Sequence, residues 1–144
     1  MQPGISSQIF VRERLDAHHA AVIGRTGFKA VEVYGFTPHF DITNILRAKA
    51  VRHFFESEGV AISGLHCPIS SMQPKKRTPK LLSISSLDEK ERTLAIDTVK
   101  QAAESAEALG AGIVIVHFGL FSDTDSSAFA DAASSSLAAI ETAL

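Results

Sequence analysis

Short apolar runs alternate with longer amphipathic stretches along the whole chain. Four runs are rich in β-branched residues and bounded by Gly or Pro, as strands are; they span residues 5–11, 30–34, 60–65 and 113–118. In the last run, Ile113, Val114, Ile115 and Val116 follow one another without a polar residue. Because strands buried on both faces of a parallel sheet lack polar alternation, the pattern predicts four parallel strands covered by helices.

Helical periodicity marks the stretches between and after these runs. The predicted helices span residues 15–24, 42–58, 86–110 and about 126 to the end of the chain. Asp41 is the predicted N-cap of the second helix, and Ser86 with Glu89 predicts a capping box at the start of the third. The second helix has one apolar stripe, which comprises Ile42, Ile45, Leu46, Val51, Phe54 and Phe55.

The resulting order of elements, β-α-β-α-β-α-β-α, predicts an α/β fold of the parallel (β/α) TIM-barrel type. Here it is a half barrel of four βα units in one domain, residues 1–144. A flavodoxin-like open sheet has the same element order, but the first run leads into Arg12, Glu13 and Arg14 without the Gly-rich turn that cradles phosphate at a helix start. Strand order separates the two folds, since the barrel keeps the order 1-2-3-4 and the open sheet has 2-1-3-4.

The composition is that of a protein that acts on small molecules. With 144 residues, 45% hydrophobic and 21% charged, the chain is typical of one core-forming domain. Its formal charge of -2 disfavours nucleic acid as a partner. No apolar segment is long enough to span a bilayer, so we expect no membrane association and a cytoplasmic location. The single cysteine, Cys67, cannot close an intrachain disulfide and is predicted to be a small buried residue.

Two histidines, His66 and His117, close the third and fourth predicted strands at equivalent places. Alternation along a strand puts His66 on the same face as Gly64 and Ile62. If these faces point into a barrel, the two imidazoles converge at its mouth, where neutral imidazole is a good ligand for Zn, Mn or Co. The alternative is a pair of partly buried histidines held by hydrogen bonds, but the matching positions favour metal ligands.

Further polar residues lie after the second and third runs. Glu32 is a carboxylate in an otherwise apolar run, so it must find a partner or face a ligand. It is a candidate to bind substrate or orient a histidine, although a surface carboxylate fits the sequence equally well. His39 follows the same run and is placed on the same side. Residues 69–85 form a predicted long loop that is either solvated or holds a substrate anion through Lys75, Lys76, Arg77 and Lys80.

Several segments, taken in order, are similar to one known family. They are GFKAVEVY at residues 27–34, HFD at 39–41, LHCP at 65–68, ALGA at 108–111 and VIVHFG at 114–119. The ordered set resembles the xylose isomerase-like TIM-barrel superfamily, which holds sugar and sugar-phosphate isomerases and epimerases together with endonuclease IV. The likeness covers nearly the whole chain and corresponds to the N-terminal half of the family's barrel.

This resemblance implies a metal-dependent isomerase or epimerase acting on a sugar or sugar phosphate. His66 and His117 would bind a divalent ion (Zn, Mn, Mg or Co) or the substrate, and Glu32 and His39 would help shape the substrate pocket. In epimerase-like members the matching histidines more often line that pocket. In endonuclease IV-like members the matching histidines bind zinc, so an abasic-site endonuclease is the alternative activity, and a non-catalytic half-barrel interaction module is a third.

The resemblance also implies that part of the active site is missing from these four units. A complete barrel has eight βα units, and the family's metal-bridging glutamate closes the fifth strand. An open half barrel leaves two strand edges unpaired, which favours association, for example as a homodimer. We therefore do not expect full activity from an isolated monomer.

Overall fold

The computed structural model describes residues 3–71, 79–119 and 126–142. The chain forms two compact units. The first unit comprises residues 1–67 and 101–115, and the second comprises residues 68–100 and 116–144. No helix in the described ranges is long and apolar enough to cross a membrane.

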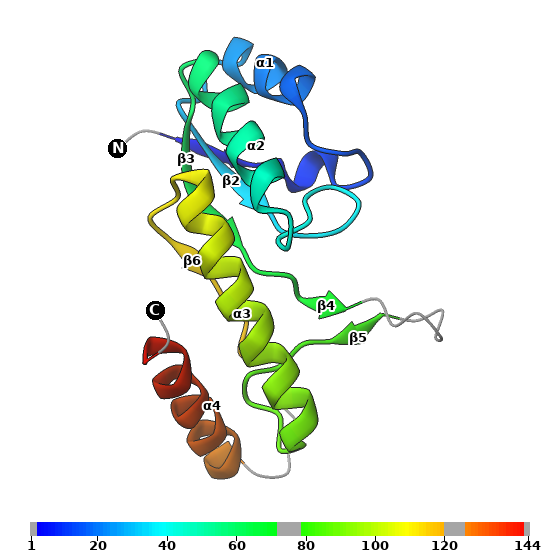
Figure 1. Ribbon diagram of the computed structural model, residues 1–144, viewed down its shortest axis with the longest axis vertical. Helices are drawn as coiled ribbons and strands as arrows, with labels where there is room; N and C mark the ends of the chain where they lie inside the picture. The colour runs from blue at the N-terminus through cyan, green and yellow to red at the C-terminus, as the bar shows by residue number, and fades with distance from the viewer. Residues whose placement is uncertain (1–2, 72–78, 120–125, 143–144) are drawn as a thin grey trace. The chain divides into compact units, whose positions relative to one another are not determined.

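The first unit is built on a four-stranded parallel sheet (Figure 1). Its strands are β1 (Gly4–Ser6), β2 (Ala30–Tyr34), β3 (Ala61–His66) and β6 (Val114–Ile115), and their order in the sheet is β1-β2-β3-β6. All three neighbouring pairs are parallel. Strand order thus follows chain order, which confirms the predicted barrel-type fold and not the flavodoxin-like alternative.

A register shift in β3 decides which side chains share a face of the sheet. Val31 pairs with Ile62 and Glu32 pairs with Gly64, so Ser63 is an extra residue in the ladder. Beyond this bulge, Tyr34 pairs with His66. The expectation that Ile62 shares a face with His66 is therefore wrong, because strict alternation does not hold across a bulge.

The first strand is much shorter than the apolar run predicts. It ends at Ser6, and a 3-10 helix, η1 (Ser7–Phe10), follows. The Ser6 hydroxyl accepts a hydrogen bond from the Gln8 N–H at 3.3 Å, which caps the turn. Ile9, inside the predicted strand, is 63% exposed. The apolar run at residues 5–11 did not predict the turn that begins at Ser6 and Ser7.

Helices α1 (Ala17–Arg25) and α2 (Ile45–Ser57) pack side by side on the sheet of the first unit (Figure 1). Their N-caps are Asp16 and Asn44, so the prediction of Asp41 as N-cap is wrong. Asp41 instead accepts hydrogen bonds from the N–H and hydroxyl of Thr43, at 2.9 and 2.8 Å. The Asp41 side chain therefore stabilises a turn before α2 and does not cap the helix.

The buried face of α2 differs from the predicted stripe. Its fully buried members are Ala48, Val51 and Phe55, each 0% exposed. Leu46, which was placed in the stripe, is 80% exposed. The helix ends at Ser57, and the φ of +66° at Gly59 lets the Val60 N–H reach back to the Phe55 carbonyl at 3.0 Å.

Helix α3 (Glu89–Leu109) crosses the boundary between the two units. Its N-terminus is not closed by the predicted Ser86–Glu89 capping box. The Asp88 carboxylate instead accepts the N–H groups of Lys90 and Glu91 at 2.9 and 3.1 Å. The hydrogen bond from Glu91, helped by that from Lys90, lowers the pKa of Asp88.

In the second unit, two short paired strands lie within residues 69–85, where the sequence predicted a long loop. Strands β4 (Ser70–Ser71) and β5 (Lys80–Leu81) are antiparallel, and α4 (Ser126–Glu141) completes the unit. Lys80 forms an ion pair with Glu91 at 2.8 Å, so this member of the basic group has a carboxylate partner. The other three basic residues, Lys75, Lys76 and Arg77, lie outside the described residues.

Candidate active site at the carboxyl ends of the strands

Polar and aromatic side chains meet where β2 and β3 end. Tyr34 and His66 are paired in register, and their ring centroids lie 5.0 Å apart. The Gly35 N–H donates to the His66 carbonyl at 2.9 Å, which ties the two strand ends together. In a parallel α/β sheet this edge is where ligands bind, because the connections leave room there.

Glu32 points to the same side of β2 as Tyr34, two residues further on. Its Oε1 accepts a hydrogen bond from the Ser6 hydroxyl at 3.1 Å, and Ser6 is its register partner on β1. The carboxylate is only partly buried. Its two oxygens have acceptor sites beyond the one that Ser6 uses, which suits a group that also binds a ligand hydroxyl.

One hydrogen bond of the His66 ring bears on which of its nitrogens could bind a metal. Its Nδ1 lies 3.0 Å from the Cys67 carbonyl oxygen, which can only accept, so Nδ1 carries the proton of the neutral ring. The lone pair is then on Nε2. Metal-binding histidines usually hold one ring N–H in this way on a backbone carbonyl or a carboxylate.

His117 belongs to the second unit and is exposed. Its predicted convergence with His66, which belongs to the first unit, stays a prediction. Within the described ranges, no group of three or more His, Cys, Asp or Glu side chains is arranged to hold a metal ion. Any metal site here would need ligands in addition to those two histidines.

His39 lies inside the first unit, 1% exposed. Its Nδ1 is 2.8 Å from the Glu13 carbonyl oxygen and its Nε2 is 2.9 Å from the Ser7 hydroxyl. Ser7 also accepts the Tyr34 N–H at 2.9 Å. The neutral ring satisfies every contact: Nδ1–H donates to Glu13, and Nε2 accepts from Ser7. Burial lowers the pKa of His39, which favours this neutral form.

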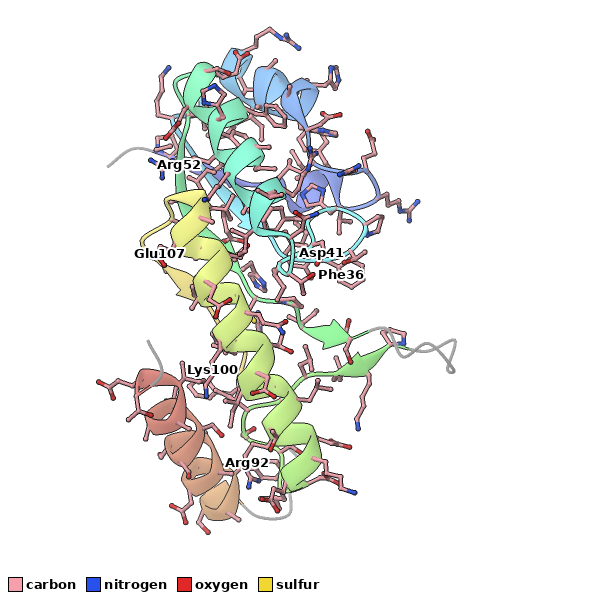
Figure 2. All side chains as sticks on the ribbon, in the orientation of Figure 1. Phe36, Asp41, Arg52, Arg92, Lys100 and Glu107 are labelled. Atoms are coloured by element: carbon pink, nitrogen blue, oxygen red, sulfur yellow. The ribbon has the colours of Figure 1, made fainter. Side chains whose placement is uncertain are left out.

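Sequence reasoning missed Ser6 and Ser7, which link the end of β1 to β2 and to His39. Both are ordinary residues on a predicted strand, and nothing in their spacing distinguishes them. The only usable signal was two adjacent hydroxyls near the start of an apolar run. Phe36, in the loop after β2 (Figure 2), also contacts this region through Tyr34, with ring centroids 6.2 Å apart.

Cys67 is buried, as predicted, and burial raises the pKa of its thiol to about 12. Because the thiolate is the reactive form, we expect the folded chain to react with iodoacetamide at pH 8 on the order of 100-fold more slowly than the urea-unfolded chain. Alkylation followed by mass spectrometry measures both rates on the same sample. Equal rates would show that the thiol is accessible and ionised in the folded chain.

A cavity of about 520 Å³ in the first unit lies away from the strand ends, between α2 and α3. Arg52 and Glu107, labelled in Figure 2, come from the two opposing helices. The cavity is thus lined by basic side chains from α2 and acidic side chains from α3, so neither sign of charge dominates it. The lining residues are Ile45, Lys49, Arg52, Glu104, Glu107 and Ala108.

The parallel sheet in chain order, with ligand-type residues at its carboxyl edge, defines a protein of the β/α-barrel class. The sequence model of the xylose isomerase-like TIM barrel matches residues 20–143. The chain therefore belongs to the xylose isomerase-like TIM-barrel family. None of the curated proteins matches the chain.

Solved structures with the same fold include several epimerases. A D-tagatose 3-epimerase-like protein is 25% identical, with a TM-score of 0.76 over 99% of this chain and 48% of its own. The 3-keto-D-glucoside 4-epimerase from E. coli is 16% identical, with a TM-score of 0.69 over 99% and 51%. An AP endonuclease of family 2 from Brucella melitensis is 15% identical, with a TM-score of 0.62 over 94% and 48%. This chain spans about half the length of these proteins.

Proposed function

We propose that this chain supplies one wall of the active site of a metal-dependent isomerase or epimerase that acts on a sugar or sugar phosphate. The observation that carries the proposal is the row of Glu32, Tyr34 and His66 at the carboxyl edge of a parallel, barrel-type sheet. Epimerases of free sugars are among the solved structures with this fold, including D-psicose 3-epimerase with D-fructose present. The similarity to the D-tagatose 3-epimerase-like protein at 25% identity adds support.

In this proposal His66 and His117 are metal ligands. The Nδ1–H of His66 is held by the Cys67 carbonyl, so its Nε2 has the lone pair that a Zn, Mn, Mg or Co ion would bind. A bound divalent ion would polarise a sugar carbonyl and stabilise negative charge on its oxygen. Because the described residues contain no cluster of three ligands, further carboxylate or histidine ligands come from elsewhere in the complete site.

Glu32 and His39 shape the substrate pocket in different ways. Glu32, steadied by the Ser6 hydroxyl, is placed to accept a hydrogen bond from a sugar hydroxyl. His39 acts through the backbone, because it joins the loop after β1 to the end of that strand. The rest of the barrel, whether further strands or a second copy of this chain, would supply the acid and base for proton transfer.

The proposal includes a cellular location and leaves out one alternative activity. We place the protein in the cytoplasm, where a free cysteine such as Cys67 stays reduced. We do not propose the endonuclease activity. The likeness to the AP endonuclease shows the fold alone, and most of the basic loop that would favour it lies outside the described residues.

Metal binding by the full chain tests the proposal. Cobalt titration, followed by visible absorption and by metal content after gel filtration, should show stoichiometric binding in the unmodified chain. The variants His66→Ala and His117→Ala should each weaken binding by about tenfold or more, because each removes a ligand. His53→Ala is the matched control, since that side chain is 86% exposed on α2.

The same samples test the reaction class. In D₂O with Mn²⁺ or Co²⁺, a ketohexose should lose its C–H signal beside the carbonyl if the complete site abstracts that proton. Gel filtration shows whether any exchange comes from a monomer or from an associated form. A well-folded chain that binds no metal, and whose histidine variants behave like the His53→Ala control, would overturn the assignment of His66 and His117 as ligands.

A further inference from the structure

The cavity between α2 and α3 in the first unit is lined by two helical faces of opposite charge. On α2, Lys49 and Arg52 lie three residues apart, and on α3 Glu104 and Glu107 have the same spacing. Residues three or four apart share one face of a helix, so each pair projects from its helix on one side. The cavity therefore has a basic wall and an acidic wall, of which Arg52 and Glu107 are labelled in Figure 2.

The two walls are not paired with each other. Within the described ranges, no ion pair joins a basic side chain of α2 to an acidic side chain of α3. Lys49, Glu104 and Glu107 are exposed and have no ion-pair partner among the described residues. The volume of about 520 Å³ between the walls is in the range of small-molecule sites. A ligand that carries both charges could bridge walls that do not reach each other.

Arg52 is the fixed part of the basic wall. Its Nε donates to the Glu56 Oε1 at 2.7 Å, one turn further along α2. Its guanidinium also covers Gly110, directly after α3, since a Cβ built there would lie 3.1 Å from the Arg52 Cζ. Backbone carbonyls at a helix C-terminus carry partial negative charge, which favours a cation at this place. The charge of Arg52 is thus partly compensated, and Lys49 is the cation that remains for a ligand.

We propose that this cavity binds a small amino acid whose ammonium and carboxylate groups are separated by a chain of methylenes. The carboxylate of the ligand pairs with Lys49, and its ammonium pairs with Glu104 and Glu107. Ile45 and Ala108, the apolar lining residues, contact the methylenes. One molecule then satisfies both walls, which a molecule with a single charge does not. The site lies away from the strand ends, so it goes beyond the reaction proposed there and does not depend on it.

The probe is 6-aminohexanoate, and hexanoate and hexylamine are its matched analogues with one charge. Each is titrated at pH 7 and low salt into the ¹⁵N-labelled full chain, whose amide shifts give the dissociation constant and the place of binding. We expect a dissociation constant on the order of 1 mM for 6-aminohexanoate, because so small a ligand buries little area. Each analogue should bind at least about fivefold more weakly, because it leaves one wall unpaired. The shifted amides should be those of residues 45–52 and 104–108.

Variants of each wall decide whether these charges hold the probe. Lys49→Met keeps the length of the side chain without its charge, and the double variant Glu104→Gln/Glu107→Gln does the same on the acidic wall. Each should weaken 6-aminohexanoate binding about fivefold or more. Lys29→Met and Glu58→Gln, at exposed positions of the first unit outside the cavity, are the matched controls and should leave the affinity unchanged.

Three results would each overturn the proposal in a chain whose amide spectrum shows that it is folded. The first is the absence of any shift at the cavity on addition of 6-aminohexanoate. The second is equal affinity for the probe and its two analogues, which would mean that the walls do not act together. The third is equal affinity in the wall variants and their controls, which would place the bound probe elsewhere.

Discussion

Replacing Phe55 by Ala should lower the free energy of unfolding of the first unit by about 4 kcal/mol. Phe55 is 0% exposed at the centre of the buried face of α2, so truncation leaves a cavity that close-packed neighbours fill only in part. That loss is a large fraction of the total stability of about 5–15 kcal/mol that is usual for a folded domain.

Urea unfolding followed by tyrosine fluorescence measures this loss selectively. The chain has one tyrosine and no tryptophan, and Tyr34 lies on β2 in the same unit as Phe55. Leu46→Ala, on the same helix and 80% exposed, is the control and should change the free energy by less than about 0.5 kcal/mol. Equal losses for the two variants would mean that α2 does not present the face to the sheet that the structure shows.

The contrast between these two residues shows what a hydrophobic pattern predicts and what it does not. The position of α2 in the chain follows from its periodicity, and β2 has the predicted limits, residues 30–34. The exact buried face does not follow, because a stripe of six apolar positions is wider than the surface the sheet covers. Leu46 therefore falls outside it, while Ala48, which the pattern did not single out, falls inside.

The other departures have local physical causes that an apolar pattern does not contain. The hydroxyls of Ser6 and Ser7 turn the chain after three residues of strand, although apolar residues continue to Val11. Ser63 adds a bulge that moves Ile62 out of the row of His66. The Ser6 cap is local, but the hydroxyls of Ser7 and Ser63 bond to the backbone of β2, so these two contacts become visible only when the strands are paired.

The candidate site was predictable in part for the same reason. His66 and Glu32 were identifiable because polar residues in or at the end of buried strands need a partner or a ligand. The partners themselves, the Cys67 carbonyl and the Ser6 hydroxyl, come from the three-dimensional register. The hydroxyls of Ser83 and Ser85, which donate to the Phe118 carbonyl, were not identifiable, because both serines lie in a segment that the sequence assigned to a loop.

The second large effect is expected at His39. Replacing it by Ala should lower the free energy of unfolding at pH 7.5 by about 3 kcal/mol, since it removes a buried ring and leaves the Glu13 carbonyl and the Ser7 hydroxyl without their partner. His39→Gln keeps an acceptor near the position of Nε2 and should lose less. His53→Gln, on the exposed side of α2, is the control and should stay within about 0.5 kcal/mol of the unmodified chain.

His39 should also make the stability of the first unit fall as the solution becomes more acidic. Burial, the largest cause, lowers its pKa in the folded chain below the ordinary value of 6.5, so in acid the unfolded chain binds a proton that the folded chain does not. The contribution is constant above pH 6.5 and is lost as the pH falls from there toward the folded pKa, with a slope of at most about 1.4 kcal/mol per pH unit. Tyrosine-detected urea titrations between pH 5 and 8 measure this slope for the unmodified chain and for His39→Gln. The slope of the variant should be smaller by His39's share. Identical slopes would mean that folding does not lower the pKa of His39.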